Sequence, residues 1–431
     1  MNRLNKFFAF LAALLIVVSN LYFSRNLYEG FRLPKAFAGM WLIALIVLLY
    51  FIARLKTLHR LFLTPVNLLL LAALLLSVLS AGLSRFPGDS YSYLAHFFTF
   101  FMLFVVLSDL FRSYPAALAV VFWTLVGTTL LISVYGLLQV ANMDPLFVLE
   151  ESAKTLSVRH RITGITGQTT LFAAILGPVL PLLLGMIPFF PGKPGWLLKA
   201  AFAAALVVTI ATMSRAVIAG VGLAIAVPVF LMAGKRWYVP LAVLLIMAVL
   251  FGGFMLAEPK ARERIVSSFS LEQGAISWRL AVWRVSLPMV KDHPLMGTGP
   301  GTFPRMFPGY LKRFLDEHPT NITQTTTQSV SRSVALQAHN DVLQNVIETG
   351  LLANICLFVA LFLILRPGRA RSAYVFNQRV PVRSFCLFLR LGILVFMVNA
   401  LFNFPFHFAT SALYFTVFTA AIYALSRGNE A

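Results

Sequence analysis

The sequence has little charge, and acidic charge is the scarcest. Of its 431 residues 12% are charged and 59% hydrophobic, whereas a soluble globular domain is about half apolar and a quarter charged. Together with a mean hydropathy of +0.84, this excludes a soluble domain and predicts an all-α polytopic membrane protein. Lys and Arg outnumber Asp and Glu by 35 to 15, a net charge of +20. Nucleic acid explains this excess poorly because no basic soluble domain exists, so we expect cytoplasmic anchoring and an anionic substrate.

Cysteine is nearly absent, and the motifs of metal enzymes and serine hydrolases are missing. Cys356 and Cys386 lie within apolar runs, where we expect buried thiols and neither a disulfide framework nor a metal site. The chain has no Asp-x-Asp pair, no His-Glu-x-x-His and no Gly-x-Ser-x-Gly, and its seven histidines are scattered. We therefore expect no metal or other cofactor. Arginines would then have to neutralise phosphate charge, as a bound metal cation usually does.

Apolar runs of the length that crosses a bilayer, about 20 residues, recur about twelve times. The predicted spans are 7–24, 36–53, 65–83, 91–111, 116–140, 170–190, 196–213, 215–232, 238–256, 343–365, 385–403 and 407–425. Only Met213-Ser214-Arg215 separates the seventh from the eighth. The first run ends near Ser24 without a small-x-small cleavage site, so we expect a retained helix with its N-terminus in the cytoplasm.

Loop charge predicts the orientation. Basic residues gather in the connections at 54–60, 235–236 and 366–383, on the same side as the basic N-terminus, so this side should be cytoplasmic. The opposite side then holds two long polar segments, about 141–169 and 257–341, which we expect to face a periplasm. Because loops of this length are usually functional or disordered, the polar chemistry should lie on this outward side.

Three parts follow along the chain. They are 1–256, with spans one to nine and the shorter periplasmic loop at about 141–169; 257–341, the large and partly helical periplasmic loop; and 342–431, with the last three spans. Within the large loop, residues 275–290 alternate tryptophan and aliphatic residues with Arg279 and Arg284, which predicts an amphipathic helix at the bilayer surface. The segment His318–Ser333 is rich in Thr, Gln and Ser and predicts a mobile flap.

His339 closes the large loop at the start of an apolar helix. Asp341 and Gln344 have the spacing of a capping box and predict a helix that begins near Val342, with Asn340 in a supporting position. A helix N-terminus favours anions and disfavours imidazolium, so the His339 ring should be neutral and able to accept a proton. A polar cap on a membrane helix, without a chemical role, explains the same residues.

Five arginines should share the outward face with His339, namely Arg159, Arg161, Arg215, Arg279 and Arg284. Few carboxylates lie near these arginines in the sequence. Because the guanidinium group binds phosphate oxygens bidentately, this set predicts a lipid phosphate or diphosphate as the ligand. The alternatives are an Arg215 that reaches the lipid head groups, a solvated charge run at 159–161, and a surface helix that carries the last two arginines.

The Gly-Thr-Gly-Pro-Gly sequence at 297–301 offers a second way to bind phosphate, through backbone N–H groups. It does not follow a strand in a βαβ unit, which is the usual context of a phosphate-binding glycine loop. A plain turn is therefore the favoured interpretation of this sequence.

Three motifs in this order resemble the O-antigen ligase and polymerase superfamily of lipopolysaccharide assembly. They are Thr212–Arg215 at a span boundary, Trp278-Arg279 through Trp283-Arg284 to Gly299, and His339–Gln344 at the start of the next span. The resemblance covers roughly residues 150–360 by motif and the whole chain by topology, and it is closest to O-antigen ligase. It implies a helical bundle of about twelve spans in a bacterial inner membrane, with a periplasmic active site.

The same resemblance implies a metal-free glycosyltransferase. Its donor would be an undecaprenyl-diphosphate-linked glycan in the membrane lipid, and its acceptor the lipid A core. His339 matches the family's essential loop histidine, Arg215 its Ser-Arg arginine, and either Arg279 or Arg284 its loop arginine; Arg159 and Arg161 match basic positions less closely. His339 would act as general base and the arginines would hold the diphosphate, with inversion at the anomeric carbon.

Three alternatives stay open on the sequence. An O-antigen polymerase and a protein O-oligosaccharyltransferase would use the same carrier with a similar histidine, and the sequence hardly reports the acceptor. A secondary transporter is the alternative from another class. Transporters usually have inverted repeats and ionisable residues at the membrane midplane, whereas here the charge lies at the outer edge and the large loop has no counterpart in the first half.

Overall fold

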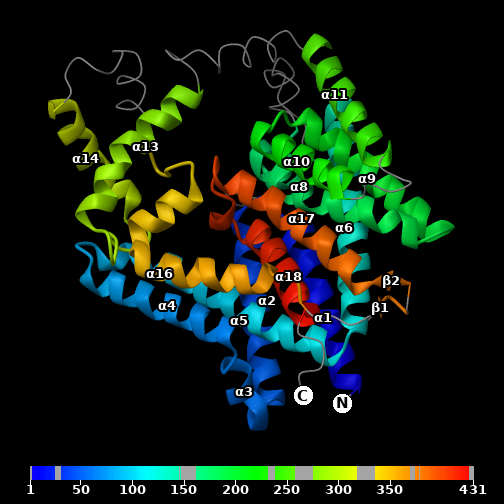
Figure 1. Cartoon of the computed structure of the whole chain (residues 1–431), viewed down its shortest axis with the longest axis horizontal. Helices are drawn as coiled ribbons and strands as arrows, with labels where there is room; N and C mark the ends of the chain where they lie inside the picture. The colour runs from blue at the N-terminus through cyan, green and yellow to red at the C-terminus, as the bar shows by residue number, and fades with distance from the viewer. Residues whose placement is uncertain are drawn as a thin grey trace.

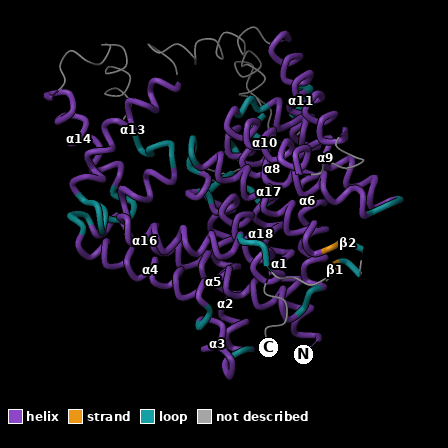
Figure 2. Tube along the Cα trace, viewed as in Figure 1, coloured by secondary structure: helices purple, strands orange, loops and turns teal. Residues whose placement is uncertain are grey.

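The computed structural model describes residues 2–24, 31–144, 146, 162–231, 238–257, 275–317, 335–368, 374–377 and 379–426. Nearly all of these residues are helical (Figure 2). Within them, ten helices are long and apolar enough to cross a membrane, and two more are shorter apolar helices. The protein is therefore an all-α, multi-pass membrane protein, as its composition predicted.

Each of the twelve predicted spans corresponds to a helix. These are α1 (Asn2–Leu21), α2 (Leu33–Ala53), α4 (Pro65–Leu83), α5 (Tyr91–Ser113), α6 (Ala116–Val140), α8 (Thr169–Met186), α9 (Lys193–Ala211), α10 (Arg215–Leu231), α11 (Tyr238–Ala257), α16 (Asp341–Leu365), α17 (Val382–Ala400) and α18 (Ala409–Ser426). In α10 and α11 the apolar stretches are the two short ones, Arg215–Val227 and Leu241–Ala257.

Short elements connect the spans. They are η1 (Leu55–Thr57), α3 (Leu58–Phe62), η2 (Pro87–Ser90), η4 (Gly164–Thr166), η5 (Ile187–Phe189), α13 (Ala275–Asp292), α14 (Phe303–Glu317), η6 (Pro405–His407), and the strands β1 (Tyr374–Val375) and β2 (Val380–Pro381), which pair antiparallel. Figure 1 shows the start of α1 at the same end of the bundle as α3, while α13 and α14 lie away from this end.

The bundle core consists of large apolar side chains contributed by most of the spans. Phe111, Phe172, Phe396 and Phe418 are among its fully buried members. Small residues allow close approach between helices, since a Cβ atom on Gly177 of α8 would clash with Val217 of α10. Both thiols were expected to be buried. Cys386 of α17 is buried, whereas Cys356 of α16 is only half-buried.

The first helix is an integral part of this bundle. Phe8 and Leu15 of α1 are buried in the core. At its far end, the Tyr414 hydroxyl donates to Asn20 Oδ1 at 3.0 Å, and Thr410 Oγ1 donates to the Ser19 carbonyl at 3.0 Å. These contacts tie α1 to α18 across almost the full length of the sequence.

Helix α16 is interrupted at Gly350, where φ is 75° and ψ is 174°. The interruption frees backbone groups, which must find partners inside a membrane protein. The segment after α13 supplies them: Thr298 N donates to Ile347 O at 2.9 Å, and Leu351 N donates to Pro294 O at 2.9 Å. Glycine is required at 350 because a Cβ would clash with the backbone of Leu295.

The amphipathic helix predicted at 275–290 is present as α13, and part of its apolar face packs within the protein. Val282, Val285 and Met289 are buried in a cluster with Phe303 and Phe307 of α14 and with Ala338, while Leu280 and Leu287 stay exposed. The prediction of a helix is thus confirmed, and its placement at the bilayer surface stays a prediction. The predicted flap at 318–333 lies outside the described residues.

Candidate active site

The residue before His339 is held on both sides. Ala338 N donates to Gln344 Oε1 at 2.9 Å, and Ala338 O accepts from Trp283 Nε1 at 2.9 Å. Gln344, predicted as part of a capping box, therefore holds the loop instead of capping the helix. These bonds support an unusual backbone, since φ of His339 is 52°, a left-handed conformation that is uncommon for a non-glycine residue and is often found at functional sites.

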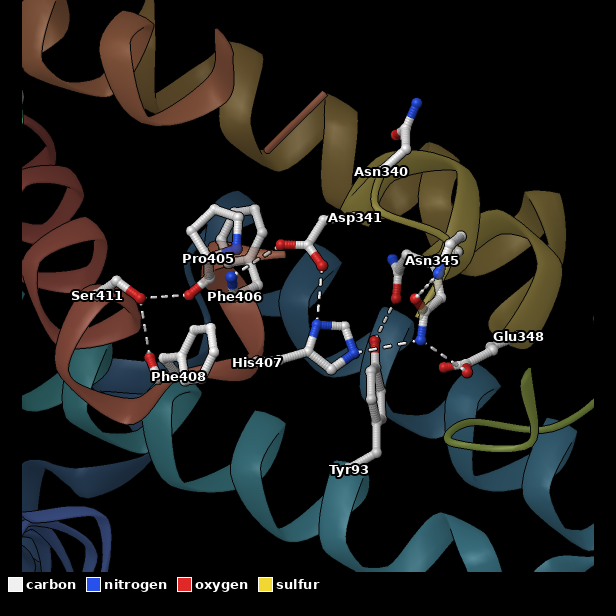
Figure 3. A network of polar contacts seen from close by, with 12 residues as sticks. Tyr93, Asn340, Asp341, Asn345, Glu348, Pro405, Phe406, His407, Phe408 and Ser411 are labelled. Atoms are coloured by element: carbon white, nitrogen blue, oxygen red, sulfur yellow. Dashed lines mark hydrogen bonds and ion pairs between the residues drawn. The ribbon is translucent and has the colours of Figure 1, made fainter. Parts of the chain in front are cut away.

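The N-cap of α16 is Asn340, and the predicted role of Asp341 as the cap is wrong. Asn340 Oδ1 accepts from Leu343 N at 3.0 Å, and the helix begins at Asp341, one residue before the predicted start. The Asp341 carboxylate instead accepts from Phe406 N and from His407 Nδ1, both at 2.8 Å. As the first helical residue, Asp341 directs its side chain toward η6 (Figure 3).

Two aromatic rings enclose the His339 imidazole. Trp278 and Phe404 meet it edge-on, with ring centroids 5.0 and 4.9 Å away and interplanar angles of 83° and 80°. Burial, and after it the positive charge of Arg279, lower the pKa of His339 to about 4. The ring is therefore neutral at pH 7, as expected, although burial and an arginine are the cause here. Its Nδ1 atom is buried without a hydrogen-bond partner among the described residues.

Arg279 links this histidine to Arg215. Burial lowers the pKa of Arg279, and the nearby positive charge of Arg215 lowers it further. Arg279 Nη2 donates to Asn403 Oδ1 at 3.4 Å, while its Nε is buried and has no partner in the described part of the chain. Two cations whose charges act on each other, with their surroundings partly dehydrated, favour an anion near them.

Arg215 begins α10 directly after a sharp break in the chain. Met213 has φ of 52°, and Ser214 N donates to Thr212 Oγ1 at 3.3 Å. Ser214 O accepts from Ile218 N at 2.9 Å, so Ser214 starts the helix that Arg215 enters. The tight boundary predicted between two spans therefore separates α9 from α10 and places a half-buried arginine at the start of α10.

The other three predicted arginines are not part of this group in the described structure. Arg284 follows Arg279 by five residues on α13, which is about 140° around a helix, and its side chain is exposed. Arg159 and Arg161 lie outside the described residues. The structure therefore brings together Arg215, Arg279 and His339 of the six residues predicted for this face.

The Gly297–Gly301 segment is a plain turn, as favoured. Its N–H groups already have partners within the protein: Gly297 N donates to His293 O, Gly299 N to Glu348 O, and Gly301 N to Glu348 Oε2 at 2.9 Å. Positive φ values of 71°, 111° and 74° explain the three glycines. The segment anchors α14 on α16 and does not offer these N–H groups to a phosphate.

The connection between α17 and α18 was not predicted from the sequence as part of the site. Asn403 contacts Arg279, Phe404 contacts His339, and Phe406 and His407 bind Asp341. These residues are the three-residue gap between the last two predicted spans and the residue on each side of it. A proline flanked by Asn403 and His407 in an otherwise aromatic stretch, on the side predicted to face outward, was the available signal.

A cavity of about 490 Å³ lies behind the His339 loop, bordered by α5, α16, α18 and η6. Tyr93, Gln337, Gln344, Glu348 and His407 form its polar end, and most of the remaining lining is apolar, with several phenylalanines. The cavity meets the His339 loop through Gln337 and Gln344. It is therefore adjacent to the arginine and histidine group and separated from it by the loop itself.

Comparison with known families supports the sequence motifs. Residues 200–358 match a family model described as O-antigen ligase. This region belongs to the O-antigen ligase superfamily. The matched region includes Arg215, Arg279, Arg284 and His339, and it ends before the connection that carries Asn403. No curated protein matches the chain. The predicted family is thus confirmed, and the roles of individual residues rest on the geometry.

Proposed function

We propose that the protein is a metal-independent membrane glycosyltransferase that moves O-antigen polysaccharide from undecaprenyl diphosphate to the lipid A core oligosaccharide. The observation that carries the proposal is the meeting of His339, Arg279 and Arg215 from three separate elements within the region of the ligase family. A neutral imidazole beside two cations combines a proton acceptor with a site for an anionic leaving group.

Arg215 and Arg279 are assigned to the donor diphosphate. Each guanidinium presents a planar set of donors that matches phosphate oxygens, and the unpartnered Nε of Arg279 is free for such a contact within the described structure. The exposed position of Arg284 supports Arg279 as the diphosphate ligand on α13. Arg159 and Arg161 stay sequence-based predictions for the same ligand.

His339 is assigned as the general base. The acceptor hydroxyl oxygen attacks the anomeric carbon of the donor, the bond from this carbon to the diphosphate oxygen breaks, and the diphosphate leaves with the electron pair. The hydroxyl proton passes to His339, and attack opposite to the leaving group inverts the anomeric carbon. Because the diphosphate offsets the charge of Arg279, donor binding raises the pKa of His339 from about 4 and makes it a stronger base.

Loop charge and the family support a location in a bacterial inner membrane with this site on the periplasmic side. The basic residues at 54–60 lie on or beside α3, which Figure 1 shows at the same end of the bundle as the start of α1 and away from α13. By the positive-inside rule this end is cytoplasmic. The three-part division 1–256, 257–341 and 342–431 belongs to the same proposal.

The test is glycan transfer by the purified protein in lipid nanodiscs, with an undecaprenyl-diphosphate-linked donor, lipid A–core acceptor and a chelator. We expect His339→Ala to lower kcat by about 10²–10⁴-fold and Arg279→Ala by about 10²-fold or more. Arg284→Ala is the matched control on the same helix and should leave kcat within about twofold. Full activity of His339→Ala, or a strict need for divalent metal, would overturn the mechanism.

The acceptor is tested by substitution in the same assay. Donor glycan should be transferred to lipid A–core and not to a second lipid-linked O-antigen repeat or to a pilin-like protein. Transfer to the repeat alone would make the protein a polymerase, and transfer to the pilin alone a protein O-oligosaccharyltransferase. Donor movement across the membrane without any transfer would indicate a transporter.

A further inference from the structure

His407 stands between two side chains of α16. Its Nδ1 lies 2.8 Å from Asp341 Oδ1, and its Nε2 lies 3.3 Å from Gln344 Nε2 (Figure 3 shows the ring and Asp341). The Asp341 side chain is 3% exposed and that of His407 28%, because the ring borders the cavity. His407 can therefore exchange protons through the cavity while Asp341 stays enclosed.

The Gln344 amide orientation is set by its other contacts. Its Oε1 accepts from Ala338 N at 2.9 Å, and its Nε2 donates to Glu348 Oε1 at 3.2 Å. The amide therefore presents a donor to His407. With this orientation, His407 Nε2 must be an acceptor, so the ring is neutral and carries its proton on Nδ1, which donates to Asp341.

A second proton on His407 changes this arrangement. Nε2 then becomes a donor and faces the donor of Gln344, so the contact is satisfied only if the Gln344 amide turns. After the turn, Oε1 accepts from His407 and the NH₂ group faces the Ala338 N–H. Ala338 then loses its acceptor, and one of the two bonds that hold the residue before His339 is broken.

We propose that His407 is a positioning residue for His339, acting through Gln344 and Ala338. Neutral His407 leaves Gln344 free to hold the His339 loop in its left-handed conformation, and protonated His407 withdraws that support. The consequence for glycan transfer rests on the proposed function, whereas the effect on the loop can be measured without any substrate.

The groups around His407 define the pH range. The titratable groups that line the cavity beside it are Asp341 and Glu348 of α16, Tyr93 and His96 of α5, and Asp89 of η2, which pairs with Arg305. Helices α17 and α18 contribute Met397 and apolar or threonine residues. Burial lowers the pKa of His407, but the hydrogen bond and charge of Asp341 and the charge of Glu348 outweigh burial and raise it. The loop should thus loosen as pH falls through a midpoint above about 6.5, the ordinary histidine value, and this midpoint belongs to the coupled pair.

His339 itself titrates elsewhere, because its pKa is lowered to about 4. In the protein without donor the two histidines are therefore separated in pH, with the positioning effect above about 6.5 and the protonation of His339 well below it. A loss of loop protection between pH 8 and pH 6 in the donor-free protein therefore cannot come from the titration of His339. In the donor complex, where the pKa of His339 is higher, comparison with His407→Gln separates the two causes.

The first experiment is hydrogen exchange of the Ala338 amide in the full-length protein, corrected at each pH for the intrinsic exchange rate. Protection should fall several-fold between pH 8.5 and pH 6 in the wild type. It should not depend on pH in His407→Gln, whose amide keeps donor and acceptor atoms without titrating. His59→Gln, an exposed histidine on α3, is the control and should behave as the wild type. Constant protection in the wild type, or an unchanged pH dependence in His407→Gln, overturns the proposal; the wild-type measurement decides even if the variant does not fold.

The second experiment is the pH profile of glycan transfer. Below the midpoint the kcat of the wild type should fall. The KM for the lipid-linked donor should stay within about twofold, since Arg215 and Arg279, which are assigned to the donor, do not bind Gln344. His407→Gln should not show this fall in kcat at low pH. If the wild type transfers no glycan to any acceptor, the proposed function fails while the exchange experiment still decides the role of His407. If transfer occurs with neither effect, the positioning role fails and the proposed function stands.

Discussion

Asn403 Oδ1 lies 3.4 Å from Arg279 Nη2, joining positions 124 residues apart. A short connection near the C-terminus thereby orients an arginine of α13, in the long segment between α11 and α16. Asn403 is itself held, because its Nδ2 donates to Asn399 Oδ1 at 2.7 Å, and its carbonyl accepts from Asp341 N at 3.2 Å. The connection between α17 and α18 therefore belongs to the candidate active site, although it lies outside the region that matches the family.

Asn403→Ala should weaken donor binding. Arg279 would lose the acceptor that orients its guanidinium, and a hydrogen bond of this kind contributes about 0.5–1.5 kcal/mol. We expect the KM for the lipid-linked donor to rise roughly two- to tenfold, with a smaller change in kcat. Steady-state transfer kinetics measure both constants. Asn399→Ala, which removes a support of Asn403 but neither atom of its contact with Arg279, should raise the KM less. An unchanged KM would show that Asn403 does not orient Arg279.

The spans and the family motifs were predictable because they depend on local sequence. A run of about 20 apolar residues identifies a membrane helix wherever it lies in the fold, and the charge of the loops predicts an outward face for Arg215 and His339. The choice between Arg279 and Arg284 needed the rotation of α13, which depends on how Val282 and Val285 pack against α14.

Other parts of the site were not predictable for physical reasons. Helix α14 contains Pro308, which argues against a helix in the sequence. The burial of its apolar residues Phe303 and Phe307 depends on packing against α13, which the sequence alone does not show. The partner of Asp341 is 66 residues away, at His407. Spacing along the sequence cannot predict a pair this far apart. A helix-capping role was therefore the best explanation of the Asp341 carboxylate from the sequence alone.

Trp283→Phe should lower kcat without abolishing folding. The substitution removes the Nε1 donor, which bonds the Ala338 carbonyl at 2.9 Å. A buried acceptor that loses its partner costs about 1–3 kcal/mol of stability. The left-handed backbone of His339 then loses one support. We expect a several-fold lower kcat with an unchanged donor KM, measured by transfer kinetics. The control is Trp196→Phe, on an exposed side chain of α9; equal effects of both variants would contradict a specific role for Trp283.

Gly350→Ala should destabilise the protein through the interruption in α16. The residue has φ of 75°, and an added Cβ would clash with the carbonyl of Leu295, so we expect a loss of about 1–3 kcal/mol from backbone strain alone. Thermal unfolding in detergent should show a lower midpoint. Gly82→Ala, in α4 with open space around its Cα, should be neutral or slightly stabilising, since alanine has the higher helix propensity. Equal midpoints for the two variants would mean that the chain can rearrange at residue 350.

The half-buried, neutral state of His339 should make stability depend on pH. Its pKa is lowered to about 4 in the folded protein, against about 6.5 in an unfolded chain. Between these values the unfolded state binds more protons, so the contribution of His339 to stability is complete above about pH 6.5 and is lost as pH falls toward about 4. His339→Gln should therefore reduce the drop in unfolding midpoint between pH 7 and pH 5, measured by tryptophan fluorescence in detergent. His293→Gln, an exposed histidine that follows α13, should keep the wild-type drop. If His339→Gln also keeps the wild-type drop, the His339 ring is not desolvated in the folded protein. The neutral state of the base that the proposed reaction requires would then need another cause.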